Sequence, residues 1–249
     1  MKRLVRTRWL AVALSAVCST GLAENTAGQL SRLEMALDGA VRTEAERARD
    51  EFERKPLQTL EFFRFKEDMR VLELIPGVGW YTKILAPALR GDGKLYVAIG
   101  TDNIEQRLLP QPGFDEIEVL HLPEGMTLRN LDAFSFGVND LDMVLTFRNL
   151  HNLTVESRAH LNRAVFDSLK SGGLYGVKDH TRRHMEADSR SNGRRLDPVQ
   201  VIKEIQDVGF VLEDFSELHY SPVDDLSREV GDERVVGQTD RFTLLFRKP

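Results

Sequence analysis

The chain contains one cysteine, Cys18, and no long run of apolar residues. A single thiol excludes an intramolecular disulfide and any metal site built from several cysteines. The main apolar stretch, residues 9–17, is about half of the ~20 residues that a membrane-spanning helix requires. We therefore predict no permanent membrane span.

An excess of positive charge is also lacking. The 34 basic and 39 acidic side chains give a net charge of −5. Residues 1–23 carry four basic side chains and no acid, so the remainder has a net charge of −9. Nucleic-acid binding depends on a basic surface, and we predict no nucleic-acid partner. The hydrophobic content of 41% is enough for the core of a globular protein.

Residues 1–23 have the order of an export signal. A basic segment at 1–8 precedes the apolar stretch, and small residues, Gly21 and Ala23, precede Glu24. We predict cleavage after residue 23 and a periplasmic or secreted mature protein. Cys18 would leave with this signal. Lipid attachment at Cys18 is disfavoured, because the large Val17 stands where that processing prefers a small residue.

After a polar segment at 24–43, helix and strand patterns alternate through one domain, 44–249, with no internal repeat or linker. Such alternation predicts a doubly wound α/β protein with a mostly parallel sheet. The expected helices are one or two within 44–63, then 81–89, 156–170 and one that Asp197 and Pro198 begin as N-cap and first residue. The expected strands are 70–75, 94–99, 116–122, 141–147, 174–178, 210–215 and 241–246.

The first of these strands runs into a glycine turn, "VLELIPGVGW", residues 71–80. Gly77 and Gly79 remove side chains that would keep the backbone away from a ligand. Glu73, near the end of the strand, can accept a hydrogen bond from an amine. A dinucleotide loop would instead have glycine at position 82 and an acid after the second strand. Thr82 and Ile99-Gly100 stand there, which disfavours an oxidoreductase and leaves a plain tight turn as the alternative to a ligand loop.

Five stretches of the chain resemble a family of bacterial, often exported, S-adenosylmethionine-dependent methyltransferases. They are "RARDEFERKPLQTLEFF", "VLELIPGVGWYTKILAP", "LTFRNLHNL", "GVKDH" and "QTDRFTLLFRKP", in that order. The family loop reads E-L-x-P-G-G-G-W-Y-T-E-I-L-A-P, and this chain departs from it at Val78 and Lys83. The resemblance implies a class I methyltransferase fold, which is Rossmann-like and has seven strands with the last one antiparallel.

The same resemblance implies S-adenosyl-L-methionine as cofactor and locates its site. "FRNLHN" is similar to an Arg-Asn loop of quinone-biosynthesis methyltransferases that helps to close over the cofactor. An acid that normally holds the ribose hydroxyls is missing after the second strand, and Asp102 lies three residues further on than expected. The implied cofactor-binding residues are Glu73, Pro76, Gly77, Gly79, Tyr81, Thr82, Arg148 and Asn149.

Polar residues that follow the fourth and fifth predicted strands are candidates for catalysis. His151, Asp179 and His180 should emerge at the ligand edge of the sheet, where a histidine can remove a proton from the acceptor. Asp179 could orient an imidazole or raise its basicity. The alternatives are a loop-capping role for His151 and ordinary strand-end hydrogen bonds for the other two. These side chains could also bind a metal ion, but nothing fixes a ligand geometry, and we predict no metal.

Two functions from different classes fit the sequence. The first is a methyltransferase with an unknown, small-molecule acceptor; the second is a non-catalytic exported protein that keeps the fold to bind a ligand or a partner. The basic segment 180–196 is interpreted as a lid that selects an acidic or phosphate-bearing acceptor, or as a solvated loop. Asp240 and Arg241 match the family with no assigned role beyond pinning a loop. The acceptor and the oligomeric state do not follow from the sequence.

Overall fold

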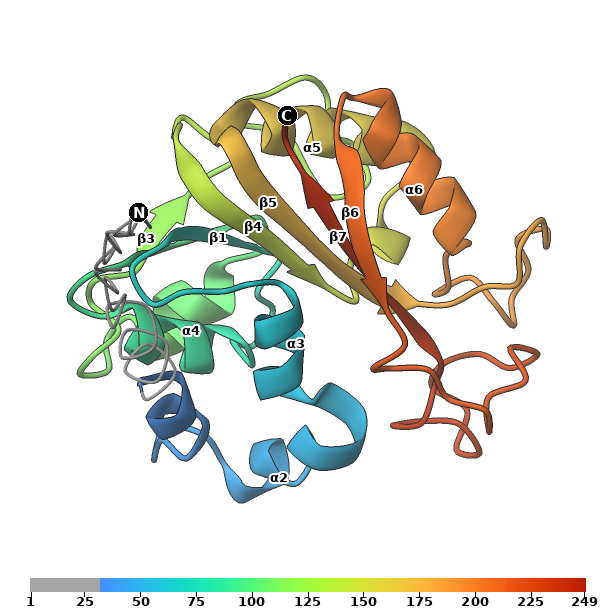
Figure 1. The fold of residues 1–249 in the computed structure, drawn as a ribbon, viewed down its shortest axis with the longest axis horizontal. Helices are drawn as coiled ribbons and strands as arrows, with labels where there is room; N and C mark the ends of the chain where they lie inside the picture. Colours follow the sequence, from blue (N-terminus) through green and yellow to red (C-terminus); the bar gives the residue numbers. More distant parts are fainter. Residues whose placement is uncertain (1–31) are drawn as a thin grey trace, which may run out of the picture.

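A computed structural model describes residues 32–249 and shows a seven-stranded sheet (Figure 1). The strand order is β3-β2-β1-β4-β5-β7-β6, and β7 runs antiparallel to both of its neighbours while the other pairs are parallel. The strands are β1 (Arg70–Leu74), β2 (Lys94–Ala98), β3 (Glu118–Leu120), β4 (Leu141–Phe147), β5 (Leu169–His180), β6 (Val211–Ser216) and β7 (Arg241–Arg247). The predicted fold class is confirmed.

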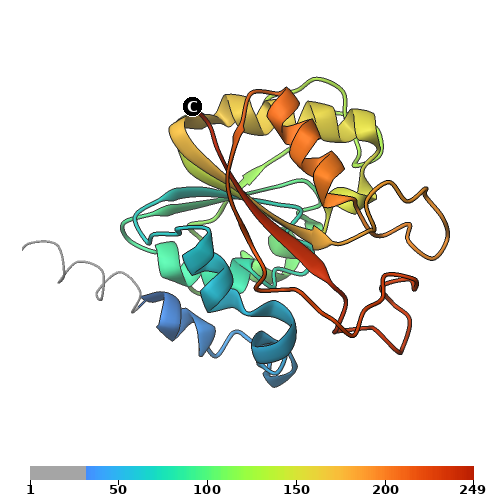
Figure 2. The same cartoon turned by 45° about the vertical axis from the view of Figure 1, so that its right-hand side comes forward.

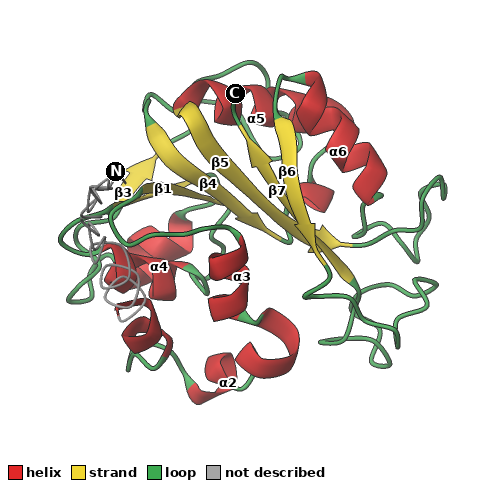
Figure 3. Cartoon of the chain, in the orientation of Figure 1, coloured by secondary structure: helices red, strands yellow, loops and turns green. Residues whose placement is uncertain are grey.

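Helices cover both faces of this sheet (Figures 1 and 3). One face carries α3 and α4, and the other carries α5 and α6. The helices are α2 (Glu44–Arg47), α3 (Pro56–Phe62), α4 (Thr82–Leu89), α5 (Val155–Ser168) and α6 (Pro198–Asp207). Three further helical segments are the π-helical turns η1 (Asp50–Arg54) and η2 (Ile104–Leu108) and the 3-10 turn η3 (Leu150–Asn152).

Alternate residues of the central strands enter two separate cores. In β4, Val144 belongs to the core beneath α5 and α6, whereas Met143 and Leu145 belong to the core beneath α3 and α4. A strand that is covered on both faces must be apolar at successive positions, which explains the nearly continuous apolar run at 141–147. Leu33 and Ala36, which precede the predicted start of the domain at 44, are also buried in the second core.

Two predicted boundaries differ from the structure. Strand β5 begins at Leu169, directly after α5, and the Gly172-Gly173 pair lies within it instead of ending a helix. Gly172 has φ of +78°, and its N–H donates to the Lys248 carbonyl, so the glycine turns the strand toward the C-terminus. Within 44–63, where the sequence predicts one or two helices, the chain is divided at Lys55, which has φ of +44° before Pro56. Such a left-handed residue cannot continue a right-handed helix.

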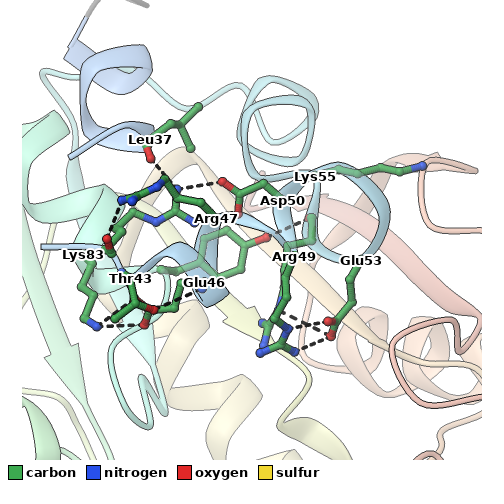
Figure 4. Close-up of polar contacts among 12 residues, drawn as sticks. Leu37, Thr43, Glu46, Arg47, Arg49, Asp50, Glu53, Lys55 and Lys83 are labelled. Carbon is green, nitrogen blue, oxygen red and sulfur yellow. Dashed lines mark hydrogen bonds and ion pairs between the residues drawn. The ribbon is translucent and has the colours of Figure 1, made fainter. Parts of the chain in front are cut away.

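Lys83, one of the two residues at which the chain departs from the loop it resembles, has a structural role. Lys83 Nζ on α4 donates to Glu46 Oε1 of α2 at 2.8 Å, as Figure 4 shows. Thr43 caps α2 and forms a reciprocal capping box with Glu46. This contact joins the N-terminal helical segments to the helix that follows the glycine loop.

The segments after β5 and before β7 extend from the carboxyl end of the sheet and lie beside each other (Figures 1 and 2). A fully buried ion pair joins them: Arg195 Nη1 lies 2.9 Å from Asp224 Oδ2, and both side chains are 0% exposed. Arg195 also donates to the carbonyls of Thr181 and Arg228. The segment 180–196, interpreted from the sequence as a lid or a solvated loop, is therefore held by buried contacts at its C-terminal end.

Asp240 pins a loop, as the sequence suggested. Its carboxylate accepts from the Ser221 N–H at 2.8 Å, and its own N–H donates to Asp224 at 2.7 Å. Asp197 caps α6 by accepting from the Val199 N–H, which confirms the predicted start of that helix.

Within residues 32–249, no helix is long and apolar enough to cross a membrane. The predicted export signal, its cleavage after residue 23 and Cys18 lie outside the described residues. The division of the chain at residues 23 and 43 stays a prediction.

We predict that Asp224→Ala destabilises the protein by about 3–5 kcal/mol, because it leaves Arg195 as a buried charge without its partner. Asp224 also accepts from the backbone N–H groups of Leu226 and Asp240, which would lose their acceptor. Urea unfolding followed by circular dichroism measures the loss.

Asp225→Ala is the matched control, because the neighbouring carboxylate is exposed and bonds to Ser227. A surface change of this kind is expected to stay within about 0.5 kcal/mol of the parent. Limited proteolysis should cut within 181–196 and 217–240 faster in Asp224→Ala than in Asp225→Ala. Equal stabilities of the two variants would show that the buried pair does not hold the loops.

Candidate functional site

A pocket of about 170 Å³ lies where β1 and β4 end, beside the glycine loop. In a parallel sheet, ligands bind at the carboxyl ends of the strands near the point where strand order reverses, and β1 and β4 meet at that point here. Six of the eight residues that the sequence assigns to the cofactor line this pocket: Glu73, Pro76, Gly77, Tyr81, Arg148 and Asn149. We call it the donor pocket.

Glu73 places a buried carboxylate in the wall of the donor pocket. Its side chain accepts from Thr82 Oγ1 at 2.7 Å, and Thr82 is fully buried at the start of α4. Burial raises the pKa of Glu73 to about 7, and the hydrogen bond from Thr82 opposes only part of this rise. Thr82 does not line the pocket, and its link to the pocket is the hydrogen bond that it donates to Glu73. The carboxylate fits a cationic ligand group such as an ammonium.

The two glycines of the loop have different roles. Gly77 has φ of +59°, and a Cβ built there would meet no atom within 4 Å. At Gly79, with φ of +81°, a Cβ would lie 2.4 Å from Leu108 Cδ1 and 3.0 Å from Ile104 Cδ1. The sequence-based explanation, that both glycines make room for a ligand, therefore needs correction at Gly79. Glycine there is required by its positive φ and by its packing against η2.

Asn149 and Tyr81 fix the shape of the donor pocket. Asn149 Nδ2 donates to the Ile75 carbonyl at 2.9 Å and to the Phe147 carbonyl at 3.0 Å, which ties the end of β4 to the glycine loop. The Tyr81 ring stacks on Phe147 with centroids 3.5 Å apart and an interplanar angle of 8°. Asn149 thereby satisfies two backbone groups at the strand ends as well as lining the pocket.

Arg148 follows β4 in a left-handed conformation, with φ of +61°. Its Nη1 donates to Glu53 Oε1 at 2.7 Å. A second, larger pocket of about 350 Å³ also has Arg148 in its wall, together with Glu53 and His180. We call this the acceptor-side pocket. Arg148 is the residue that the two pockets share.

The structure brings the three predicted catalytic residues together. His151 Nδ1 lies 2.6 Å from Asp179 Oδ1, and the His151 N–H donates to Asp179 Oδ2 at 3.1 Å. The rings of His151 and His180 have centroids 5.8 Å apart. Asp179 orients His151, across the β4–β5 pair, and not its chain neighbour His180, whose ring bonds to Thr239 Oγ1 at 2.9 Å.

The two histidines differ in their surroundings. Burial, followed by the positive charges of Arg241 and Arg148, lowers the pKa of His180 far below its usual value, so its imidazole is neutral. A base with so low a pKa removes protons poorly at neutral pH. His151 has a carboxylate partner at Nδ1, and its Nε2 has no hydrogen bond with any described residue and is not fully enclosed. His180 lines the acceptor-side pocket, whereas His151 and Asp179 line neither pocket.

Several residues at this edge were given no role in a ligand site from the sequence. Lys178 is fully buried and donates to Tyr81 Oη at 2.8 Å and to the Arg54 carbonyl at 3.1 Å. Burial and the charge of Arg54 lower the pKa of Lys178 well below its usual value, which favours a neutral amine. Glu53, Arg54 and Arg241 complete the cluster. All four lie in stretches that carry the sequence resemblance described above, and that resemblance was the only signal available.

Asp102 does not take the place of the missing ribose-binding acid in the donor pocket. Its side chain is exposed and is not among the residues that line this pocket. Within residues 32–249, no group of three or more His, Cys, Asp or Glu side chains is arranged to hold a metal ion.

Solved structures with similar folds include methyltransferases. A SAM-dependent methyltransferase from Aquifex aeolicus matches with a TM-score of 0.55 and 17% identity, over 80% of this chain and 92% of that chain. The glycopeptide N-methyltransferase MtfA complexed with sinefungin matches with a TM-score of 0.52 and 17% identity, over 77% of this chain and 93% of that chain. The fold is that of the class I methyltransferases.

This fold also occurs in a protein named for a different reaction. The cyclase SpnF matches with a TM-score of 0.51 and 16% identity, over 88% of this chain and 92% of that chain. No family model and no curated protein sequence matches the chain. At identities this low the likeness shows the fold alone, and function has to be argued from the site.

We predict that Glu73→Gln stabilises the ligand-free protein at pH 8, by about 3 kcal/mol. The folded pKa of about 7 lies above the usual value of 4.5, so the unfolded chain loses this proton first as pH rises. Ionisation of Glu73 therefore lowers the free energy of unfolding progressively between pH 4.5 and 7, and this loss reaches its full value above pH 7. Urea unfolding of both proteins from pH 4.5 to 8 measures the difference, which should vanish at the acid end.

Glu105→Gln is the control for this experiment, because Glu105 also accepts from a threonine, Thr101, at 2.6 Å but does not line the donor pocket. Its effect on stability should not change between pH 4.5 and 8. A Glu73→Gln protein that is no more stable than the parent at pH 8 would contradict the raised pKa.

Proposed function

We propose that the chain is an S-adenosylmethionine-dependent methyltransferase that acts on a small-molecule acceptor. The observation that carries this proposal is the buried Glu73 carboxylate in the wall of the donor pocket, with Thr82 as its partner. A buried carboxylate whose ionisation is disfavoured is costly unless a cation binds it. The ammonium of the methionyl part of the cofactor is a cation of this kind.

The donor pocket supplies the remaining contacts of this proposal. Gly77 leaves open space beside the loop, and Tyr81 and Phe147 form a stacked apolar wall. When bound, S-adenosylmethionine supplies an electrophilic methyl group. Methyl transfer is an in-line displacement, so the residues of this chain act mainly by aligning the two reactants and excluding water.

On the acceptor side, His151 Nε2 takes the proton that the acceptor releases. Asp179 holds the imidazole through Nδ1 and so directs Nε2 away from the strand pair. His180, kept neutral by its surroundings, contributes a hydrogen-bonding group to the wall of the acceptor-side pocket.

A non-catalytic binding protein is the second candidate function. The observation that favours it is the absence of a carboxylate after β2 in the donor pocket, where Ile99 and Gly100 stand and Asp102 points to solvent. In this case an adenosyl ligand would bind weakly or not at all. Export of the mature protein, proposed from residues 1–23, agrees with either function.

We predict that S-adenosylhomocysteine binds the protein and that Gly77→Asn weakens this binding by at least tenfold. Asparagine tolerates the left-handed conformation of residue 77, so the fold is retained while a side chain enters the space beside the loop. Isothermal titration calorimetry of both proteins measures the effect. Titrations from pH 6 to 8 should also show weaker binding as pH falls below about 7, because Glu73 becomes protonated.

Gly172→Asn is the matched control. Gly172 has φ of +78° and equally open space, but lies at the amino-terminal part of β5, away from the donor pocket. Parent-like affinity in Gly172→Asn, with the loss confined to Gly77→Asn, supports the proposal. Absence of binding by the parent protein would favour the non-catalytic alternative.

We predict that His151→Gln lowers kcat by about 10²–10⁴-fold with any acceptor that requires proton removal, while the affinity for S-adenosylhomocysteine stays unchanged. Glutamine retains a hydrogen bond to Asp179 but cannot serve as a base. Steady-state kinetics and calorimetry give the two values. His160→Gln is the control, because His160 is a partly exposed histidine on α5. Equal kcat in the two variants would remove His151 from the mechanism.

A further inference from the structure

The acceptor-side pocket is strongly positive. Its volume of about 350 Å³ is that of a small-ligand site. Residues from four parts of the chain line it, and among them are Arg49, Glu53, Arg148, His180, Arg194 and Arg241. Four guanidinium groups and one carboxylate therefore face the same space.

Glu53 offsets only part of this charge. It accepts from Arg49 Nε and Nη2, both at 2.5 Å, as Figure 4 shows, and from Arg148 Nη1 at 2.7 Å. Arg241 Nη2 lies 3.6 Å from the same carboxylate. Burial alone would raise the pKa of Glu53, but the hydrogen bond from Arg49 and the charge of Arg148 lower it to about 2. One ionised carboxylate is thus shared by three arginines.

Arg194 is neutralised by a different acid, Glu229, with which it forms a paired contact. Arg54 adds a further positive charge next to Glu53, at 3.7 Å, on the side of the donor pocket. Counting Arg49, Arg148 and Arg241 against Glu53, the pocket keeps a net excess of two positive charges. Asp179 lies behind this wall and does not line the pocket.

Arg241 is the second observation that indicates a missing anion. Its side chain is 3% exposed, and its Nη1 donates to the Glu53 carbonyl at 2.7 Å. Its Nε and Nη2 have no hydrogen-bond partner among the described residues. Burial and the charge of Arg148 lower the pKa of Arg241 to about 10. Buried polar groups without partners are rare in folded proteins and commonly mark a place where a ligand or ion binds.

The position of this charge relates it to the donor pocket. Arg148 lines both pockets, and His180 of the acceptor-side pocket lies beside the proposed base, His151. An anion held by Arg49, Arg148 and Arg241 would lie in the same pocket as His180, whose ring centroid is 5.8 Å from that of His151. Its charge would also offset the combined positive charge of the arginines and of a bound sulfonium.

We propose that the methyl acceptor carries an oxyanion, a carboxylate or a phosphate, which Arg49, Arg148 and Arg241 bind in the acceptor-side pocket. This inference rests on the proposed methyltransferase function. It assigns the recognition of the acceptor to Arg49 before η1, Arg148 after β4 and Arg241 at the start of β7. From the basic segment 180–196 that the sequence suggested, the pocket receives Arg194, which is paired with Glu229, and His180.

The test is calorimetry with inorganic phosphate and with benzoate as separate probes, each titrated into the protein with and without S-adenosylhomocysteine. At least one probe is expected to bind, and the stronger one identifies the group as phosphate or carboxylate. Arg49→Gln should weaken that binding about tenfold, because it removes a charge-assisted contact. Its side chain is 41% exposed, so the fold does not depend on it, and Glu53 keeps its other arginine partners.

Arg163→Gln is the matched control, because it removes one exposed arginine of α5 and the same unit of charge. Arg241→Gln, at a buried position, should lower the affinity for the probe at least as much as Arg49→Gln. Equal affinity in Arg49→Gln and Arg163→Gln, or no binding of either probe by the parent, would overturn the inference. If S-adenosylhomocysteine binds while both probes fail, the inference fails and the proposed function stands. If a probe binds with the expected arginine dependence but S-adenosylhomocysteine does not bind, the pocket is an anion site. The methyltransferase proposal then fails, and so does the assignment of the anion to a methyl acceptor.

Discussion

The carboxylate of Glu53 is the contact on which the candidate site depends. It joins η1 to the end of β4 through Arg148 and lies beside Arg241 at the start of β7. Without this carboxylate, the arginines at the edge of the sheet would repel one another in a partly buried space. With it, they stay together and retain an excess of positive charge. The same contact therefore stabilises the edge of the sheet and prepares it for an anion.

Two buried groups at this edge are held in states that burial disfavours. Glu73 is a carboxyl whose ionisation is opposed by burial, and Arg241 lacks hydrogen bonds at two nitrogens. Each reduces the stability of the ligand-free protein. His180 is kept neutral by burial and by the charges of Arg241 and Arg148. Perturbed groups of this kind cluster at functional sites, where a ligand supplies the missing partner. The carboxylate faces the donor pocket and the arginines face the acceptor-side pocket, so the two pockets differ in the charge that they favour.

The fold by itself does not choose among functions, because methyltransferases and a cyclase share it. The choice is made by side chains at the carboxyl ends of the strands. His151 is held by Asp179 beside His180, the donor pocket has a buried carboxylate in its wall, and the acceptor-side pocket has several arginines in its wall. On these features rests our proposal of methyl transfer over simple ligand binding.

The sequence by itself determined the fold and the position of the glycine loop after the first strand. Apolar runs in strands, the Asp197 cap and the match at 71–87 are local patterns, and their period and order predict a doubly wound sheet. Only the tertiary structure decided which polar groups meet. Asp179 orients His151 instead of His180, Gly79 packs against Leu108, and Arg241 joins Glu53 from 188 residues away along the chain. The physical reason is that these contacts depend on strand order and register, which bring distant residues together, whereas local sequence patterns report only neighbours along the chain.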